Sequence, residues 1–481
     1  MALKQRSISQ IYRIDHSFGP VSIKKALLVL TAILIAAAGA AQERFQLPPY
    51  TRLTLDNGLT IFLMEQHEVP LVQLTTVFPA GAVYDSKGKH GLADATASAL
   101  QLGSKKYTKS QIEETVDYMG ASLGTVANKE TGMLYASFLK KDQKAMLDII
   151  QDILLYPVFP EGEWKKLQDL KLAKLDQMKE SPRSSIQNYY DGFVFGGHPY
   201  GNAEEGNKED VRSLTISDLK DFYGSHYVPN GAVMAVVGDF EAKEMGSQLK
   251  TLFNGWKKGS QKLPEMPTLN YPDSSRILLV DKKDARETTF LIGGKGIPRN
   301  NPDYVGVQVV NTILGGRFTS WLNDELRVNS GLTYGAGSRF NTYKLGGTFT
   351  ISTFTANETT EQAIDLALKT YDRLHTQGVD AATLESAKNY LKGQFPPEYE
   401  TNASLAGLLT DMHLYGFDES YIDTFTQKVD DLDRDQLDIL IKKYFPKEHL
   451  QFVLIGKADG IGEMAKKYGK LETRNLLDDG F

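Results

Sequence analysis

The chain has 481 residues, of which 41% are hydrophobic and 24% are charged, a balance that excludes collagen-like, mainly disordered and multi-span membrane proteins. Its 54 Lys and Arg residues stand against 60 Asp and Glu residues, and the resulting formal charge of -6 excludes a basic nucleic-acid footprint. The lack of cysteine excludes disulfides, thiolate metal sites and a cysteine nucleophile, so any metal would need His, Asp or Glu ligands.

The first feature along the chain is an apolar run, residues 26–41, which follows Lys24 and Lys25 and precedes the polar residues 42–44. A positive flank, a short apolar core and small residues at its end are typical of a secretory signal. A retained membrane anchor is the alternative, although the run is shorter than the ~20 residues that span a bilayer. We therefore expect residues 1–41 to be a signal peptide that exports the protein to a bacterial periplasm, where a cysteine-free chain needs no oxidative folding.

The remainder of the chain repeats one plan. Four short segments recur in the same order at a spacing of about 220 residues, which indicates an internal duplication. The corresponding positions are Gly81 and Gly296, Trp164 and Leu384, Leu219 and Leu437, and Gly238 and Gly456. The repeat predicts an N-terminal domain over residues 42–258, a linker over 259–272 and a C-terminal domain over 273–481.

Each repeat has the pattern of an α+β domain. Residues 53–66 alternate apolar and polar side chains around an Asn-Gly turn, which predicts a hairpin. Residues 72–78 continue as a strand, whereas residues 144–155 and 163–179 place apolar side chains three and four apart, as helices do. We expect two tandem homologous domains, each a sheet with its helices packed on one face.

Residues 91–98 read Gly-Leu-Ala-Asp-Ala-Thr-Ala-Ser and open a predicted helix just after a strand. This segment resembles the inverted zinc motif Gly-Leu-Ala-His-x-x-Glu-His of the pitrilysin/insulinase-type (inverzincin) metallopeptidases, a family that includes the mitochondrial processing peptidases. In that family the two His side chains bind zinc on one face of the helix, and the Glu deprotonates the metal-bound water.

The chain departs from that motif at every chemical position. The resemblance places the two His ligands at Asp94 and Ser98, the general base at Ala97 and the third ligand near Lys174. An ammonium group at a ligand position repels Zn²⁺, so we expect no zinc in this chain. The alternative is a replaced metal site formed by His90, Asp94 and Ser98, which are spaced four residues apart.

Residues 314–338 carry a second resemblance, to the C-terminal signature of the same family. Apolar side chains recur every four residues and predict a helix with one buried stripe, formed by Leu314, Phe318, Leu322 and Leu326. Arg327 lies in its last turn, and Tyr334 follows seven residues later within Gly-Leu-Thr-Tyr. The family signature has a Gly-Gly pair, a Leu-Arg pair and a Gly-Leu-x-Tyr segment, with its Arg and Tyr at the same spacing.

The resemblance implies that Arg327 and Tyr334 hold a substrate carbonyl and the oxyanion formed during peptide hydrolysis, because both side chains donate hydrogen bonds. The alternative is structural, with Arg327 stabilising a helix end and Tyr334 buried in a strand. Some bacterial members of the family are heterodimers in which one subunit carries the zinc motif and the other the Arg/Tyr pair.

Taken together, these features predict an exported, zinc-less subunit of a heterodimeric metallopeptidase. It would be inactive alone and would contribute to proteolysis with a homologous, zinc-bearing partner, with peptides as the substrate. We expect no cofactor in this chain, no nucleic-acid partner and no membrane span after signal cleavage. A non-catalytic peptide-binding or assembly scaffold of the same family is the alternative.

Overall fold

The computed structural model describes residues 46–260 and 264–481. The predicted signal peptide, residues 1–41, lies outside these ranges. Residues 47–481 form one compact unit. Within the described ranges, no helix combines the length and the apolar character needed to cross a membrane.

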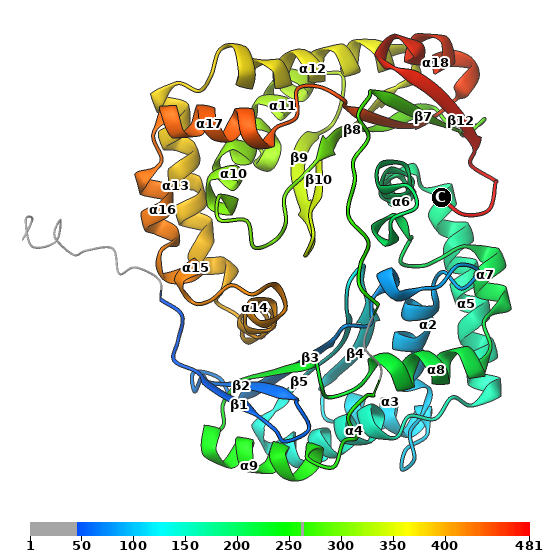
Figure 1. Ribbon diagram of the computed structural model, residues 1–481, viewed down its shortest axis with the longest axis vertical. Helices are drawn as coiled ribbons and strands as arrows, with labels where there is room; N and C mark the ends of the chain where they lie inside the picture. The colour runs from blue at the N-terminus through cyan, green and yellow to red at the C-terminus, as the bar shows by residue number, and fades with distance from the viewer. Residues whose placement is uncertain (1–45, 261–263) are drawn as a thin grey trace, which may run out of the picture. The chain divides into compact units, whose positions relative to one another are not determined.

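The N-terminal half contains one sheet, whose strands are β1 (Thr51–Thr54), β2 (Thr60–Glu65), β3 (Leu71–Phe78), β4 (Ser122–Ala127), β5 (Gly132–Leu139) and β6 (Val233–Gly238). Their order in the sheet is β1-β2-β6-β3-β5-β4, and all of them except β6 are labelled in Figure 1. β2 and β6 are parallel and the other neighbours are antiparallel. β1 and β2 form the predicted hairpin, and Gly58 in its turn has a φ of 94°, which glycine adopts without strain.

The described residues of the N-terminal half also form eight α-helices. They are α2 (Leu92–Ala99), α3 (Lys109–Tyr118), α4 (Gln143–Leu155), α5 (Glu161–Glu180), α6 (Pro182–Phe195), α7 (Lys208–Ser213), α8 (Ile216–His226) and α9 (Ala242–Phe253).

The C-terminal half contains the second sheet, with strands β7 (Arg276–Asp281), β8 (Glu287–Lys295), β9 (Ala336–Thr342), β10 (Gly347–Ala356), β11 (Gln451–Gly456) and β12 (Lys470–Asn475). Its helices are α10 (Tyr304–Asn311), α11 (Trp321–Asn323), α12 (Thr360–Thr376), α13 (Ala381–Glu398), α14 (Asn402–Tyr415), α15 (Ser420–Asp423), α16 (Phe425–Asp431), α17 (Arg434–Tyr444) and α18 (Ala458–Ala465). Two π-helical turns, η5 (Thr312–Gly316) and η6 (Asp324–Asn329), flank α11.

The two sheets share one topology. The second has the order β12-β7-β11-β8-β10-β9, so five of its strands follow the path of β2, β6, β3, β5 and β4 in the first. β7 and β11 are parallel, as are β2 and β6. Only the outer strand differs, because β12 runs parallel to β7 whereas β1 runs antiparallel to β2. The predicted duplication and the α+β class are therefore confirmed.

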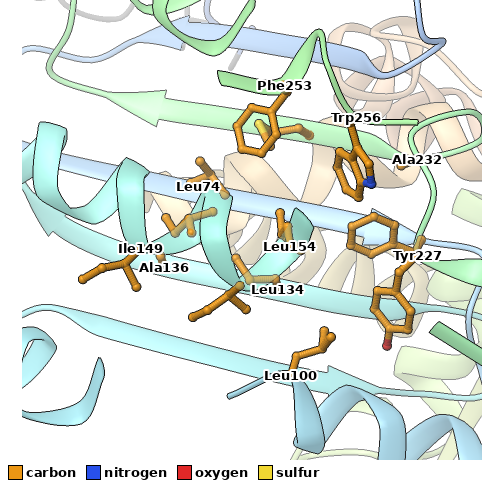
Figure 2. Close-up of a cluster of buried hydrophobic side chains, with 14 of the residues drawn as sticks. Leu74, Leu100, Leu134, Ala136, Ile149, Leu154, Tyr227, Ala232, Phe253 and Trp256 are labelled. Atoms are coloured by element: carbon orange, nitrogen blue, oxygen red, sulfur yellow. The ribbon is translucent and has the colours of Figure 1, made fainter. Parts of the chain in front are cut away.

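One face of the N-terminal sheet packs on the helices of its own half. Figure 2 shows this core, in which Leu74 and Leu134 of the strands lie close to Ile149 and Leu154 of α4 and Phe253 of α9. None of the five is more than 1% exposed. Burial of one such side chain stabilises the fold by roughly 1.5–3 kcal/mol.

The opposite face of each sheet is covered by a helix of the other half. α14 contacts β3 and β6, and α6 contacts β8 and β11. Phe62 of β2, which alternates with the core-facing residues, makes a ring contact with His413 of α14. In the second sheet, Ile186 and Tyr190 of α6 pack against Leu291 of β8. This reciprocal exchange joins the halves and fixes α6 next to the C-terminal sheet.

Candidate functional site

The helix that carries the degenerate motif, α2, begins at a tightly constrained turn. Gly91 precedes it with a φ of 90°, and a Cβ at this position would lie 2.7 Å from the carbonyl oxygen of Glu205. Only glycine fits both constraints. The buried carboxylate of Asp85 accepts hydrogen bonds from the N–H groups of Gly91 (2.7 Å) and Ala93 (2.9 Å). Burial raises the pKa of Asp85 to about 8, while the Ala93 and Gly91 N–H groups act against that rise.

A lysine ammonium lies between the two positions at which the family has its His ligands. Lys171 of α5 donates from Nζ to Asp94 Oδ2 at 2.6 Å, to the Asp94 carbonyl at 3.2 Å and to Ser98 Oγ at 2.9 Å. The Lys171 side chain is 10% exposed and that of Asp94 is 19% exposed. Ser98 Oγ also donates to the Asp94 carbonyl at 2.8 Å. These groups therefore satisfy one another without a metal.

The other sequence-predicted residues of this region lie elsewhere. The Lys174 side chain is 59% exposed and faces Glu205 at 3.6 Å, so the ammonium beside Asp94 is that of Lys171, one helical turn earlier. Ala97 is fully buried. His90 bonds through Nδ1 to Asp210 at 2.6 Å and does not join Asp94 in a cluster.

The residues present do not suit zinc. Among residues 46–260 and 264–481, no group of three or more His, Asp or Glu side chains could hold a metal ion. At the position of the family's site, a bound cation would have to displace the Lys171 ammonium and then rely on one carboxylate and one hydroxyl. The alternative metal site of His90, Asp94 and Ser98 is therefore not formed, because His90 pairs with Asp210 instead.

The segment before Arg327 is not the single helix that the sequence predicts. Leu314, Leu322 and Leu326 are fully buried as expected, but Phe318 is 68% exposed. The π-helical turn η5 ends at Gly316 and the chain is extended at Arg317, so the four-residue stripe is interrupted there. The prediction for Phe318 was therefore wrong, because periodicity alone does not reveal a π-helical turn.

Arg327 and Tyr334 lie in the wall of one cavity. Arg327, in η6, has its guanidinium carbon 4.5 Å from the centre of the Phe318 ring. Tyr334 lies just before β9 and is 84% exposed, and its ring faces that of Phe354 at 6.4 Å. The exposure of Tyr334 contradicts the alternative that it belongs to the strand core. The turn between the two residues is fixed by Gly331, which has a φ of 66°.

The cavity has a volume of about 690 Å³, which is within the size range of ligand sites. Strands β8, β9 and β10, the start of α6 and the loop around Arg317 line it. Of the residues that line it, sequence reasoning named Arg327 and Tyr334 but not the α6 residues Arg183 and Gln187, which come from the other half of the chain. Their only sequence signal is the Ser-Pro start of α6, which does not reveal where the helix packs.

Sequence comparisons cover both halves. The family description "Insulinase (Peptidase family M16)" matches residues 60–205, and "Peptidase M16 inactive domain" matches residues 213–391. Together these ranges include α2, the cavity and most strands of the two sheets.

Individual relatives agree with that assignment. A Helicobacter pylori protein named non-peptidase homolog YmxG is 23% identical over 395 residues, covering 81% of this chain and 90% of that protein. A Bacillus subtilis protein named uncharacterized zinc protease YmxG is 23% identical over 353 residues, covering 73% and 85%. A crystal structure of a peptidase M16 inactive domain from Pseudomonas fluorescens is 25% identical, with a TM-score of 0.80, and covers 85% of this chain and 98% of that one. The chain therefore belongs to the insulinase-type peptidase family M16.

Proposed function

We propose that this chain is an exported, inactive M16 subunit that pairs with a homologous zinc-bearing subunit and supplies Arg327 and Tyr334 to the shared active site. One observation carries the proposal. The position of the zinc ligands is filled by the Lys171 ammonium, whereas Arg327 and Tyr334 border an open cavity. A chain that has the Arg/Tyr pair but no metal site can assist catalysis only if a second subunit supplies the zinc.

The proposed roles follow from the donor groups. A guanidinium has five N–H donors in a fixed fork and suits a substrate carbonyl, and a phenol donates one O–H. The Tyr334 hydroxyl would stabilise the oxyanion that forms when water attacks the peptide carbonyl. Zinc in the partner would supply the activated water, and this chain would supply the hydrogen-bond donors that face it.

The position of Arg327 also supports a binding role. Its guanidinium stacks on Phe318, which is itself 68% exposed. The Phe318 ring is not part of the buried core, so the contact orients the Arg327 side chain at the cavity wall more than it stabilises the fold. A pure scaffold would have no use for a guanidinium held in this way.

The test is reconstitution with an M16 homologue from the same organism that contains the His-x-x-Glu-His motif. We expect co-expression to give a heterodimer that buries more than ~2,000 Å². We expect Tyr334→Phe, which deletes only the hydroxyl, to lower kcat roughly 10²–10³-fold, as the loss of one oxyanion donor does elsewhere. Arg327→Ala should also cripple turnover, with assembly unchanged for both.

Matched controls come from exposed side chains outside the cavity. Tyr118 of α3 is 92% exposed, so Tyr118→Phe should leave kcat unchanged. Arg212 of α7 is exposed as well and serves as the control for Arg327. Wild-type turnover from well-assembled Tyr334→Phe and Arg327→Ala complexes would contradict the proposal and leave the scaffold function instead. A chain that elutes only as a monomer would contradict the heterodimer.

A further inference from the structure

The only charged side chains that line the cavity beside Arg327 and Tyr334, among the described residues, are positive. Four arginines line it, and none of the described lining residues is acidic. They come from three separate parts of the fold, since Arg183 begins α6, Arg317 and Arg327 flank α11, and Arg339 lies on β9. The start of α6 adds the positive end of a helix dipole to the same wall.

Neutral groups hold these guanidiniums in place. Arg183 stacks on Phe354 at 3.4 Å from the ring centre, as Arg327 stacks on Phe318. Arg339 Nη2 donates to Gln187 Oε1 at 2.6 Å. Arg317 Nη1 donates to the carbonyl and hydroxyl oxygens of Ser386. Ring and amide contacts of this kind orient a guanidinium while leaving its charge in place.

Carboxylates of the protein itself offset little of this charge. Within the described ranges, no ion pair within 4.0 Å involves Arg317, Arg327 or Arg339. Arg183 has one partner, Glu287, at 3.2 Å, but the two side chains are 57% and 48% exposed. An exposed pair of this kind contributes little and exchanges readily with other carboxylates.

We propose that the cavity binds acidic side chains of the substrate, so that the complex prefers peptides with Asp or Glu next to the bond that Arg327 and Tyr334 engage. This inference rests on the proposed function for its place in catalysis. A guanidinium fork matches a carboxylate with two parallel hydrogen bonds, and pre-oriented forks lose little entropy on binding. The exposed ring of Phe318 and the half-buried ring of Phe354 offer apolar contact to the stem of Glu.

The charge of the whole chain favours a short acidic peptide over a polyanion. The formal charge of -6 repels an extended nucleic acid, whereas a single acidic side chain responds to the local field within a Debye length of ~10 Å. The cavity is therefore suited to one or two carboxylates and not to a long anionic backbone.

The test measures peptide binding to this chain alone, by fluorescence anisotropy at low ionic strength. The probe is a short labelled peptide, blocked at both ends, that carries Asp and Glu, and its comparison carries Asn and Gln instead. We expect the acidic peptide to bind about tenfold more tightly, because charge-assisted hydrogen bonds replace neutral ones. In the double variant Arg183→Gln/Arg339→Gln the preference should fall to about twofold or less, whereas Arg212→Gln should keep it.

Two further ligands decide between sources of negative charge. A neutral peptide with a free C-terminus that binds as tightly as the acidic one would make the ligand a chain end and overturn the proposal. A short oligonucleotide that binds equally well would overturn it too, since the site would then select only charge. Because the partner is absent from this experiment, a binding preference can hold even if the reconstituted complex is inactive, and an active complex can lack the preference.

Discussion

Charged side chains have different kinds of partner in two regions of this molecule. In the region of α2, the Lys171 ammonium donates hydrogen bonds to Asp94 and Ser98. Around β9, Arg327 and Arg339 are oriented by neutral groups, and Tyr334 stands exposed to solvent. The first arrangement favours stability, because each of these polar groups has a hydrogen-bond partner inside the protein. The second leaves hydrogen-bond donors accessible at the cavity wall, as the proposed function requires.

The largest effect is expected when zinc ligands are restored to the region of α2. The triple variant Asp94→His/Ser98→His/Lys171→Glu should hold about one zinc per chain after dialysis, whereas the wild-type chain should hold none. Two His side chains one turn apart and a facing Glu match zinc coordination, and the repelling ammonium is removed. Ala97 stays unchanged because it is fully buried and metal binding needs no general base. Elemental analysis gives the result.

The matched control replaces Lys174 instead of Lys171. Asp94→His/Ser98→His/Lys174→Glu retains the Lys171 ammonium beside both His positions, so it should bind zinc about 100-fold more weakly or worse. Equal zinc affinity in the two triple variants would show that Lys171 does not occupy the metal position. Stoichiometric zinc in the wild-type chain would contradict the expectation that this chain binds no zinc.

Local sequence patterns and the internal repeat predicted much of this fold. The Asn57-Gly58 hairpin, the strand 72–78 and the repeat of about 220 residues all follow from local chemistry or from similarity within the chain. The exchange of α6 and α14 could not be predicted in the same way. An amphipathic pattern shows that a helix is buried but does not say against which sheet, and both halves offered an apolar face.

Sequence counting placed a lysine near the degenerate motif but named the wrong one. Lys171 and Lys174 lie on one helix three residues apart, and counting from a distant motif cannot separate them, whereas the distances to Asp94 do. Phe318 was misplaced by a π-helical turn, which changes the helical register without a sequence signal. Arg183 was missed because it reaches the cavity only through the exchange of α6.

The next largest effect is on stability, and it distinguishes Lys171 from Lys174 on α5. Lys171→Met should lower the free energy of unfolding by about 1–3 kcal/mol, because Asp94 and Ser98 would lose their shared donor in a largely buried setting. Lys174→Met should cost about 0–1 kcal/mol, since its pair with Glu205 is long and its side chain is 59% exposed. Urea denaturation of both variants measures the difference. Equal losses would mean that the Lys171 network is no more than a surface ion pair.

The smallest expected effect is on stability in the region around β9. It tests whether Arg327 contributes to the stability of the fold. Arg327→Ala removes a ring contact with Phe318 and a favourable cation at the end of η6, each worth about 0.3–1 kcal/mol. We therefore expect the urea midpoint to change by less than it does in Lys171→Met. The two variants delete one positive charge each, and they differ in what that charge contacts, a carboxylate in one and an exposed ring in the other. If Arg327→Ala destabilised the chain as much as Lys171→Met does, Arg327 would be a structural residue. Any loss of turnover in the reconstituted complex would then reflect damage to the fold and not the absence of a substrate-binding group.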